Sequence, residues 1–144
     1  MKKILVLNGP NLNRLGKREP EIYGRNTLED IQIMLDQVSS SMGVKLEHYQ
    51  SNHEGALIDR IYEAADAGFK GVIFNPGAYS HTSIALRDAI AGSGMSFIEV
   101  HISNIYKREE FRHNSYTAEV STGVISGLGI QGYMAALHYL AMHA

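Results

Sequence analysis

Short apolar runs alternate along the chain with segments of helical periodicity, and this alternation constrains the fold more than any other feature. Residues 4–7, 44–50, 71–75 and 97–101 are predicted strands, and a weaker fifth run lies near 118–125. Continuous apolar runs of this length are typical of parallel strands that are buried on both faces. The sequence therefore predicts an α/β protein with five parallel strands.

Four segments place apolar residues at helical intervals: 27–42, 57–67, 83–91 and 130–142. Thr27 and Asp30 have capping-box spacing, with Asp in place of the usual Glu or Gln. The last helix is apolar on most sides, which fits either packing on the sheet alone or an additional subunit interface. Strands that alternate with helices predict a doubly wound sheet with helices on both faces, and we expect the flavodoxin-like strand order.

Size and composition narrow the class of protein. The 144 residues fit one domain, and 44% hydrophobic with 19% charged residues is ordinary for a soluble protein. The absence of cysteine excludes disulfides, thiolate metal sites and thiol nucleophiles, and the net charge of -2 argues against a nucleic-acid binder. No apolar run approaches the ~18 residues of a membrane span, and residues 4–7 are too few for a signal-peptide core. We expect a cytoplasmic protein that binds neither nucleic acid nor membrane.

Polar side chains gather where the predicted strands end. Asn8 and Asn11 follow the first strand, Asn75 ends the third, and Glu99 and His101 end the fourth. Ligands of open parallel sheets bind beyond this edge, so the convergence favours a site, although an Asn beside Pro or Gly is usually a turn former. Glu99 and His101 share one face of a strand, where a carboxylate fixes the imidazole tautomer and favours its protonated form. The pair suits a general acid or, equally, a buried ion pair without chemistry.

The connection 9–26 is longer than the ~12–15 residues that structureless loops in compact domains rarely exceed. Its charged residues are mostly basic: Arg14, Lys17, Arg18 and Arg25 against Glu19 and Glu21. It also carries Tyr23, followed by a glycine. Long loops of this kind are functional lids or disordered excursions. We interpret 9–26 as a mobile lid on a single catalytic domain spanning 1–144, and a solvated basic loop is the alternative.

Several motifs of other enzyme classes are absent. The chain has no Walker A sequence, no Gly-x-Gly-x-x-Gly, no Gly-x-Ser-x-Gly and no His-x-x-x-His pair. Dinucleotide binding, serine hydrolysis and zinc catalysis therefore have little support, and no acidic cluster follows the first strand. A flavodoxin-like module that binds an anion or nucleotide without catalysis stays open, as does another lyase or hydrolase on this fold.

The motifs of the chain, taken together, resemble the type II 3-dehydroquinate dehydratases. The matching stretches keep that family's order and spacing over nearly the whole chain: residues 8–13, 16, 18–20, 23–24, 50–55, 75–79, 81–83, 99–104 and 108–115. Tyr106 stands where many members have histidine, outside the matching catalytic positions. The resemblance implies loss of water from 3-dehydroquinate to give 3-dehydroshikimate, a step of the shikimate route to aromatic amino acids. It implies no metal or organic cofactor and a homododecamer built as four trimers.

The resemblance also assigns roles by matching position. Tyr23 would be the base, assisted by Arg18, and His101 the acid, oriented by Glu99. Asn11 would hold a water near the developing enolate. The implied substrate-binding residues are Asn75, His81, Asp88, Ile102, Ser103 and Arg112, with Asp88 supplied by a neighbouring subunit.

Elementary chemistry agrees with these roles. Taking a proton from the carbon beside a ketone needs a base and a group that stabilises the enolate, and expelling hydroxide needs an acid. A free tyrosine has a pKa of about 10, so a tyrosine base needs cations that stabilise its phenolate. One arginine is marginal for this task, and we expect Arg18 to be helped by Arg14 or another cation of the lid.

Overall fold

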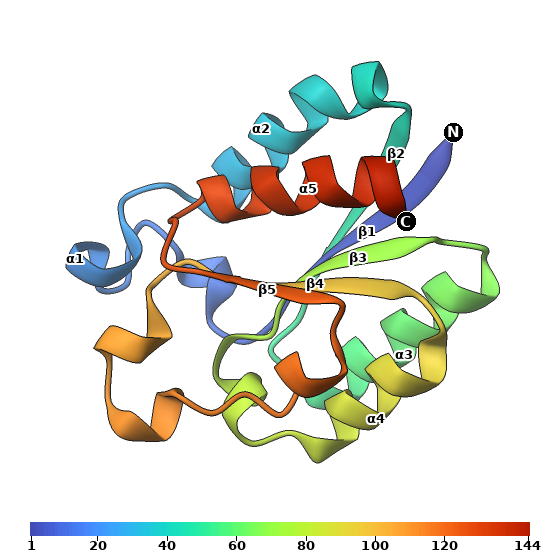
Figure 1. Ribbon diagram of the computed structural model, residues 1–144. Coiled ribbons are helices and arrows are strands. Elements are labelled where there is room, and N and C mark those ends of the chain that lie inside the picture. The colour runs from blue at the N-terminus through green and yellow to red at the C-terminus, as the bar shows by residue number, and fades with distance from the viewer.

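The computed structural model describes residues 1–144 and contains one five-stranded sheet between two layers of helices (Figure 1). The strands are β1 Lys2–Asn8, β2 Val44–Gln50, β3 Gly71–Asn75, β4 Ser96–His101 and β5 Gly123–Ser126. Their order is β2-β1-β3-β4-β5, and every neighbouring pair is parallel. The predicted α/β class and flavodoxin-like doubly wound order are confirmed.

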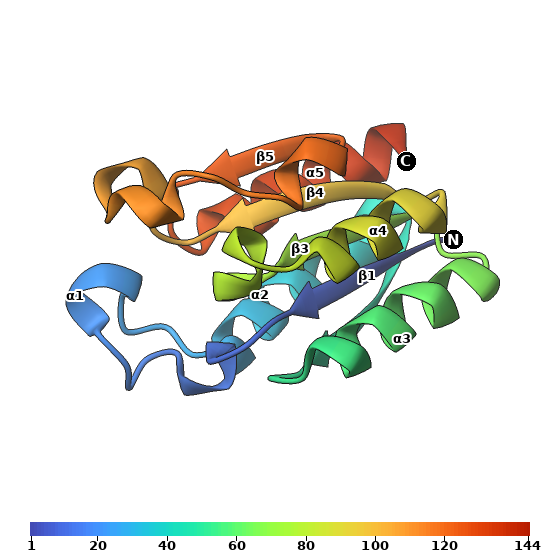
Figure 2. The same cartoon turned by 90° about the horizontal axis from the view of Figure 1, so that it is seen from below.

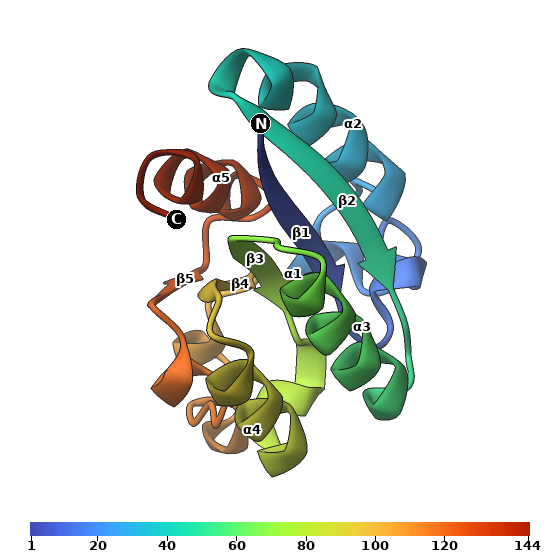
Figure 3. The same cartoon turned by 90° about the vertical axis from the view of Figure 1, so that its right-hand side faces the viewer.

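Helices cover both faces of the sheet. Figures 1 and 3 show α2 (Leu28–Ser39) and α5 (Gln131–His143) on one side, and α3 (Glu54–Asp66) and α4 (Ile84–Ser93) on the other. The first pair buries Ile31, Leu35, Leu137 and others against the even-numbered side chains of β1. The second pair packs against Leu5 and Leu7, because successive strand residues point to opposite faces. All five residues of β3 are buried, which explains the continuous apolar run 71–74 that precedes Asn75.

The local signals at the start of α2 act as predicted. The Asp30 amide donates to the Thr27 hydroxyl at 3.1 Å, and the Thr27 amide donates to the Asp30 carboxylate at 2.9 Å. This reciprocal pair is the capping box that the sequence indicated. The helix continues into a 3-10 turn, Ser40–Met42, and ends at Gly43 in the left-handed conformation with φ of 73°.

The weak fifth run is only half a strand. Ala118–Val120 form a 3-10 helix, and β5 spans only Gly123–Ser126. The amide of Ala118 donates to the Ser115 hydroxyl at 3.1 Å, which turns the chain before it reaches the sheet. The prediction of one strand near 118–125 is therefore wrong in its first half.

Only one side of the last helix, α5, is buried within the chain. Tyr133, Ala136, Leu137 and Leu140 are fully buried against the sheet, whereas Met142 is 78% exposed. Packing on the sheet therefore accounts for the inner side of α5.

The segment between β1 and α2 contains two short helices, η1 (Leu12–Arg14) and α1 (Pro20–Tyr23). Leu12 and Leu15 belong to the core, so the first part of the predicted lid is packed. The part that follows carries α1 beyond the carboxyl ends of the strands, away from the sheet (Figure 2).

The two ends of this outer part meet at Gly16. The residue has φ of 86°, and a Cβ atom there would lie 2.9 Å from the carbonyl oxygen of Arg25. A side chain would be strained in this conformation and would collide with the returning backbone, so glycine is required. Residues 17–25 thus form a loop that leaves and rejoins the molecule at one point.

Among the helices, none combines the length and the apolar character that crossing a bilayer demands.

Candidate active site

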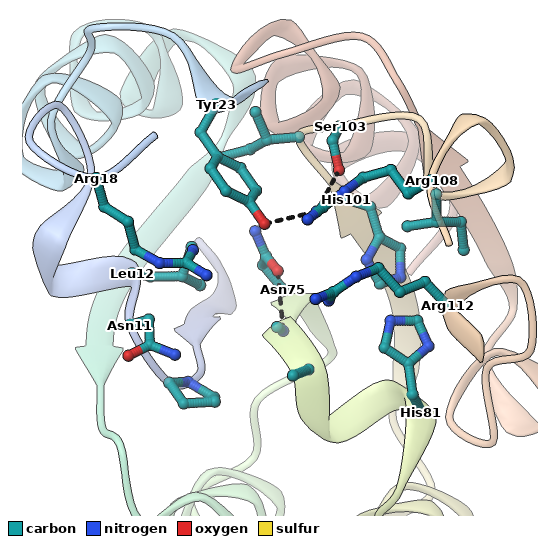
Figure 4. Close-up of a pocket in the computed structure, with 15 residues that line it drawn as sticks. Asn11, Leu12, Arg18, Tyr23, Asn75, His81, His101, Ser103, Arg108 and Arg112 are labelled. Atoms are coloured by element: carbon teal, nitrogen blue, oxygen red, sulfur yellow. Dashed lines mark hydrogen bonds between the residues drawn. The ribbon is translucent and has the colours of Figure 1, made fainter. Parts of the chain in front are cut away.

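The carboxyl ends of β1, β3 and β4 and the outer loop surround one pocket (Figure 4). Most of the site residues expected from the sequence line it: Asn11, Arg18, Tyr23, Asn75, His81, His101, Ile102, Ser103 and Arg112. Glu99 lies behind His101, and Asp88 is elsewhere. Arg108, which the sequence analysis did not single out, also lines the pocket.

A close approach of two strand ends shapes the pocket floor. Gly9 follows β1, and its amide donates to the carbonyl of Asn75 at 2.8 Å. A Cβ atom at Gly9 would stand 2.6 Å from the carbonyl oxygen of Pro76, so only glycine allows the segments after β1 and β3 to touch. Asn11 then adopts a left-handed conformation, with φ of 70°, and its backbone amide donates to the side-chain oxygen of Asn52 at 3.0 Å. The carboxamide of Asn11 is thereby directed to the pocket (Figure 4).

His101 and Glu99 form a buried pair at the end of β4. The Nε2 atom of His101 lies 2.7 Å from the Glu99 carboxylate, as their spacing on one strand face predicted. The His101 side chain is 6% exposed and that of Glu99 is 0%. Because Nε2 faces the carboxylate and the ring lines the pocket, Nδ1 is the atom available to a ligand.

The Glu99 carboxylate accepts two further hydrogen bonds. The Ser115 hydroxyl donates at 2.7 Å, and the Thr117 hydroxyl donates to the other carboxylate oxygen. Burial alone would raise the pKa of Glu99, but the hydrogen bonds from His101, Thr117 and Ser115 and the adjacent imidazole outweigh it and hold the pKa below its ordinary value. Glu99 is therefore a fixed negative charge beneath His101.

Tyr23 reaches the pocket from the end of α1, and its hydroxyl contacts Arg108. Arg108 Nη1 donates to the Tyr23 oxygen at 2.6 Å and lies 3.4 Å from the Ser103 hydroxyl (Figure 4). Arg18 lies instead over the ring of Tyr23, 5.0 Å from its centroid, and pairs with Glu19. The Arg108 side chain is 13% exposed against 39% for Arg18, so Arg108 is the better shielded cation.

The second cation expected near Tyr23 thus comes from outside the lid. Arg14 is exposed and does not line the pocket, whereas Arg108 follows the 3-10 helix after β4. Arg108 and Arg112 are four residues apart, and both face the pocket (Figure 4). This spacing in the 108–115 stretch is the sequence signal that could have identified Arg108.

Positive charge dominates the pocket wall. Arg18, Arg108 and Arg112 line it, and no aspartate or glutamate does. Guanidinium groups match the geometry of a carboxylate and bind it with paired, charge-assisted hydrogen bonds. The pocket therefore suits a small anionic ligand.

His81 offers a hydrogen-bond acceptor on the same wall. Its Nδ1 lies 2.8 Å from the Asn114 carbonyl oxygen and so carries the proton, which leaves Nε2 as an acceptor in the neutral ring. Burial lowers the pKa of His81 and, with the nearby His101 and Arg112, outweighs the Asn114 carbonyl, which raises it. The His81 and His101 rings stack with centroids 6.3 Å apart.

Asn75 is held by Tyr133, a buried tyrosine of α5 that the sequence did not assign to the site. The Tyr133 hydroxyl donates to the side-chain oxygen of Asn8 at 2.6 Å and accepts from the side-chain nitrogen of Asn75 at 2.9 Å. Burial raises the pKa of Tyr133, so this phenol remains a donor. The amide of Gly77 donates to the Asn75 side-chain oxygen at 3.1 Å. These bonds fix the Asn75 side chain as it faces the pocket.

Asp88 lies apart from these residues. It is exposed on α4 and does not line the pocket of its own chain. Tyr106 is also outside the pocket, with 62% of the residue exposed.

The structure contains no group of three or more His, Asp or Glu side chains arranged to hold a metal ion.

Comparisons with known proteins agree across sequence and fold. The profile described as Dehydroquinase class II matches residues 2–141. A protein named 3-dehydroquinate dehydratase 1 from Ralstonia nicotianae is 59% identical over 137 residues, 95% of this chain and 88% of that protein. A 3-dehydroquinate dehydratase from Bordetella avium is 56% identical over 142 residues, 99% of each chain. The crystal structure of a type II dehydroquinase from Butyrivibrio crossotus superposes with a TM-score of 0.94 at 52% identity, covering 96% of this chain and 97% of that one. The match spans almost every residue and includes those that line the pocket, so the chain belongs to the class II dehydroquinase family.

Proposed function

We propose that the protein removes water from 3-dehydroquinate to give 3-dehydroshikimate, a step of the shikimate route to aromatic amino acids. The observation that carries the proposal is a single pocket in which Tyr23 and His101 face inward among arginines with no lining carboxylate. The substrate is a carboxylate that bears a ketone, and this wall complements its charge. Membership of the dehydroquinase family supports the same reaction.

In this proposal Tyr23 is the base. Arg108 at 2.6 Å from its oxygen and Arg18 over its ring stabilise the phenolate. The phenolate takes a proton from the carbon next to the ketone, and the electron pair moves to the ketone oxygen as an enolate. Asn11, whose carboxamide is free at the pocket wall, would hold a water that donates to this oxygen.

His101 is the acid that completes the elimination. As the enolate reforms the ketone, its electron pair forms a carbon–carbon double bond to the adjacent carbon. The carbon–oxygen bond of that carbon breaks, and His101 protonates the departing hydroxide to give water. The fixed charge of Glu99 orients the ring and stabilises its protonated form. The side of the pocket that would bind the substrate is formed by Asn75, His81, Ile102, Ser103 and Arg112.

The direct test is ultraviolet absorbance on addition of 3-dehydroquinate. The product contains a conjugated enone, which absorbs where the substrate does not. An increase in absorbance that follows the enzyme concentration supports the dehydratase, and binding of the substrate without any increase supports a non-catalytic anion-binding module. Retention of activity after exhaustive dialysis against a chelator is expected for a reaction carried by these side chains alone.

The two arginines beside Tyr23 are expected to differ in effect. Because Arg108 bonds the phenol oxygen and is more buried, Arg108→Gln should lower kcat by about 10²-fold, and Arg18→Gln by about 10-fold. Both should change KM much less than kcat. Steady-state kinetics measure the split between kcat and KM, and Arg14→Gln is the matched control because Arg14 is exposed and outside the pocket. A larger loss in Arg18→Gln than in Arg108→Gln would contradict this ranking.

We further propose that the site is completed across subunits of a homododecamer built from four trimers. Asp88, assigned to the site by the family resemblance, is exposed on α4 and outside its own pocket, which supports a role in a neighbour's site. The particle is then expected to be many times the 15.9 kDa of one chain.

Mixing two inactive variants tests this arrangement. Tyr23→Phe and Asp88→Ala should each lose most activity, yet subunits exchanged between them should form some sites with an intact Tyr23 and an intact Asp88. We expect activity in the co-assembled mixture above the sum of the separate variants, and light scattering gives the particle mass. Absence of complementation in a verified mixed assembly would place Asp88 in a single-subunit role.

A further inference from the structure

Ser115 and Thr117 donate hydrogen bonds to the buried carboxylate of Glu99, whose other hydrogen-bond partner is His101. Glu99 is 0% exposed, Thr117 is 0% exposed and Ser115 is 9% exposed. Ser115 donates to one carboxylate oxygen and Thr117 to the other, and the two hydroxyl oxygens lie 3.2 Å apart. Neither residue lines the pocket, so neither is placed to touch a ligand.

We propose that Ser115 and Thr117 are positioning residues that keep Glu99 charged and thereby set the acid strength of the Glu99–His101 pair. The inference rests on the proposed dehydratase function, in which this pair gives up a proton. The two hydroxyls act through Glu99 and never contact the substrate.

The acid strength of the pair depends on how well the protein stabilises it after it has lost its proton. In the protonated pair, the imidazolium partly compensates the carboxylate charge. After proton transfer the buried carboxylate faces a neutral ring, and the two hydroxyls are then its principal stabilisers. Removing one hydroxyl destabilises the deprotonated pair more than the protonated pair. The pair should then hold its proton more tightly and become a weaker acid.

The other charged or titratable groups that line the pocket with His101 are Arg18, Tyr23, His81, Arg108 and Arg112. They lie on three different segments: the outer loop, the turn after β3 and the segment after β4. A substitution at Thr117 leaves all five in place, because the Thr117 side chain bonds only to Glu99 and Ser115. A change in the titration of the pair in that variant therefore reports the lost hydroxyl.

The test is the pH profile of kcat/KM for Thr117→Val, which keeps the shape of the side chain and removes the donor. We expect the descending limb, where the acid loses its proton, to move to higher pH by about one unit, with about a 10-fold lower plateau. Thr117→Ser restores the hydroxyl and should return both values toward the original. Thr122→Val is the matched control, since Thr122 is exposed and its hydroxyl bonds to nothing in the chain. The limb is assigned to the pair by its absence in His101→Ala.

A descending limb that stays in place in Thr117→Val, or moves to lower pH, overturns the inference even if activity falls. A role in packing alone would lower activity without moving the limb. If Thr117→Val does not fold by circular dichroism, Ser115→Ala removes the other donor and carries the same expectation and the same refutation. Failure of the unmodified protein to dehydrate 3-dehydroquinate would instead refute the proposed function, so the two failures are distinguishable.

Discussion

Replacing Tyr23 with Phe is expected to lower kcat by about 10²–10⁴-fold while the affinity for 3-dehydroquinate changes by less than about threefold. The substitution removes only the hydroxyl, which is bound to Arg108 at 2.6 Å and is the proposed base. The ring and its contacts with the two arginines remain, so the pocket keeps its shape. Steady-state kinetics give the loss of turnover, and isothermal titration calorimetry gives the affinity.

Tyr106→Phe is the matched control for this variant. Tyr106 is 62% exposed and outside the pocket, so loss of its hydroxyl should leave turnover unchanged. Normal turnover in Tyr23→Phe would mean that α1 only covers the pocket and that the base is another group.

His101→Ala is expected to lower kcat by about 10²–10⁴-fold, because the hydroxide then leaves without a proton donor. The ring also forms part of the pocket wall and stacks with His81, so substrate binding should weaken severalfold. Glu99→Gln should be less damaging, since it leaves the acid in place and removes only the charge that orients the ring and stabilises its protonated form. Rapid mixing with the substrate separates the loss of chemistry from the loss of binding.

His138→Ala serves as the comparison for a histidine outside the site. His138 is exposed on the outer side of α5, and its removal should leave kinetics unchanged. Unaltered kcat in His101→Ala would remove this ring from the mechanism and leave the Glu99 pair as an ion pair without chemistry.

Hydrophobic periodicity was sufficient to predict most strands and helices, because each of these elements follows a pattern of residues that are close in sequence. The first four residues of β3 are apolar because helices cover both faces of the strand, and Thr27 begins α2 through a bond to a residue three positions away. The strand predicted at 118–120 was wrong because the backbone amide of Ala118 donates to the side chain of Ser115, three residues earlier. Alternating apolar residues cannot reveal that competition.

The partners of the site residues were harder to predict than the residues themselves. Tyr23 and Arg108 are 85 positions apart, and only the folded chain brings them together. The high pKa of a free tyrosine indicated the need for a second cation, but the basic residues of the lid pointed to the wrong segment. The hydroxyls that hold Glu99 lie 16 and 18 positions beyond it, in a stretch with no periodic pattern. Sequence spacing predicts contacts within one element well, and contacts between elements poorly.

The close approach of the two ends of the 17–25 loop at Gly16 has a consequence for protein engineering. Residues 17–25 leave and return at one point, so their number does not determine where β1 and α2 lie. The entropy of closing such a loop grows slowly, by about 0.6 kcal/mol for each doubling of length. Foreign sequence inserted between Tyr23 and Arg25 should therefore be tolerated by the sheet while it changes which molecules can enter. A change in this loop therefore acts on substrate admission and on the base Tyr23, while the acid pair on β4 stays in place.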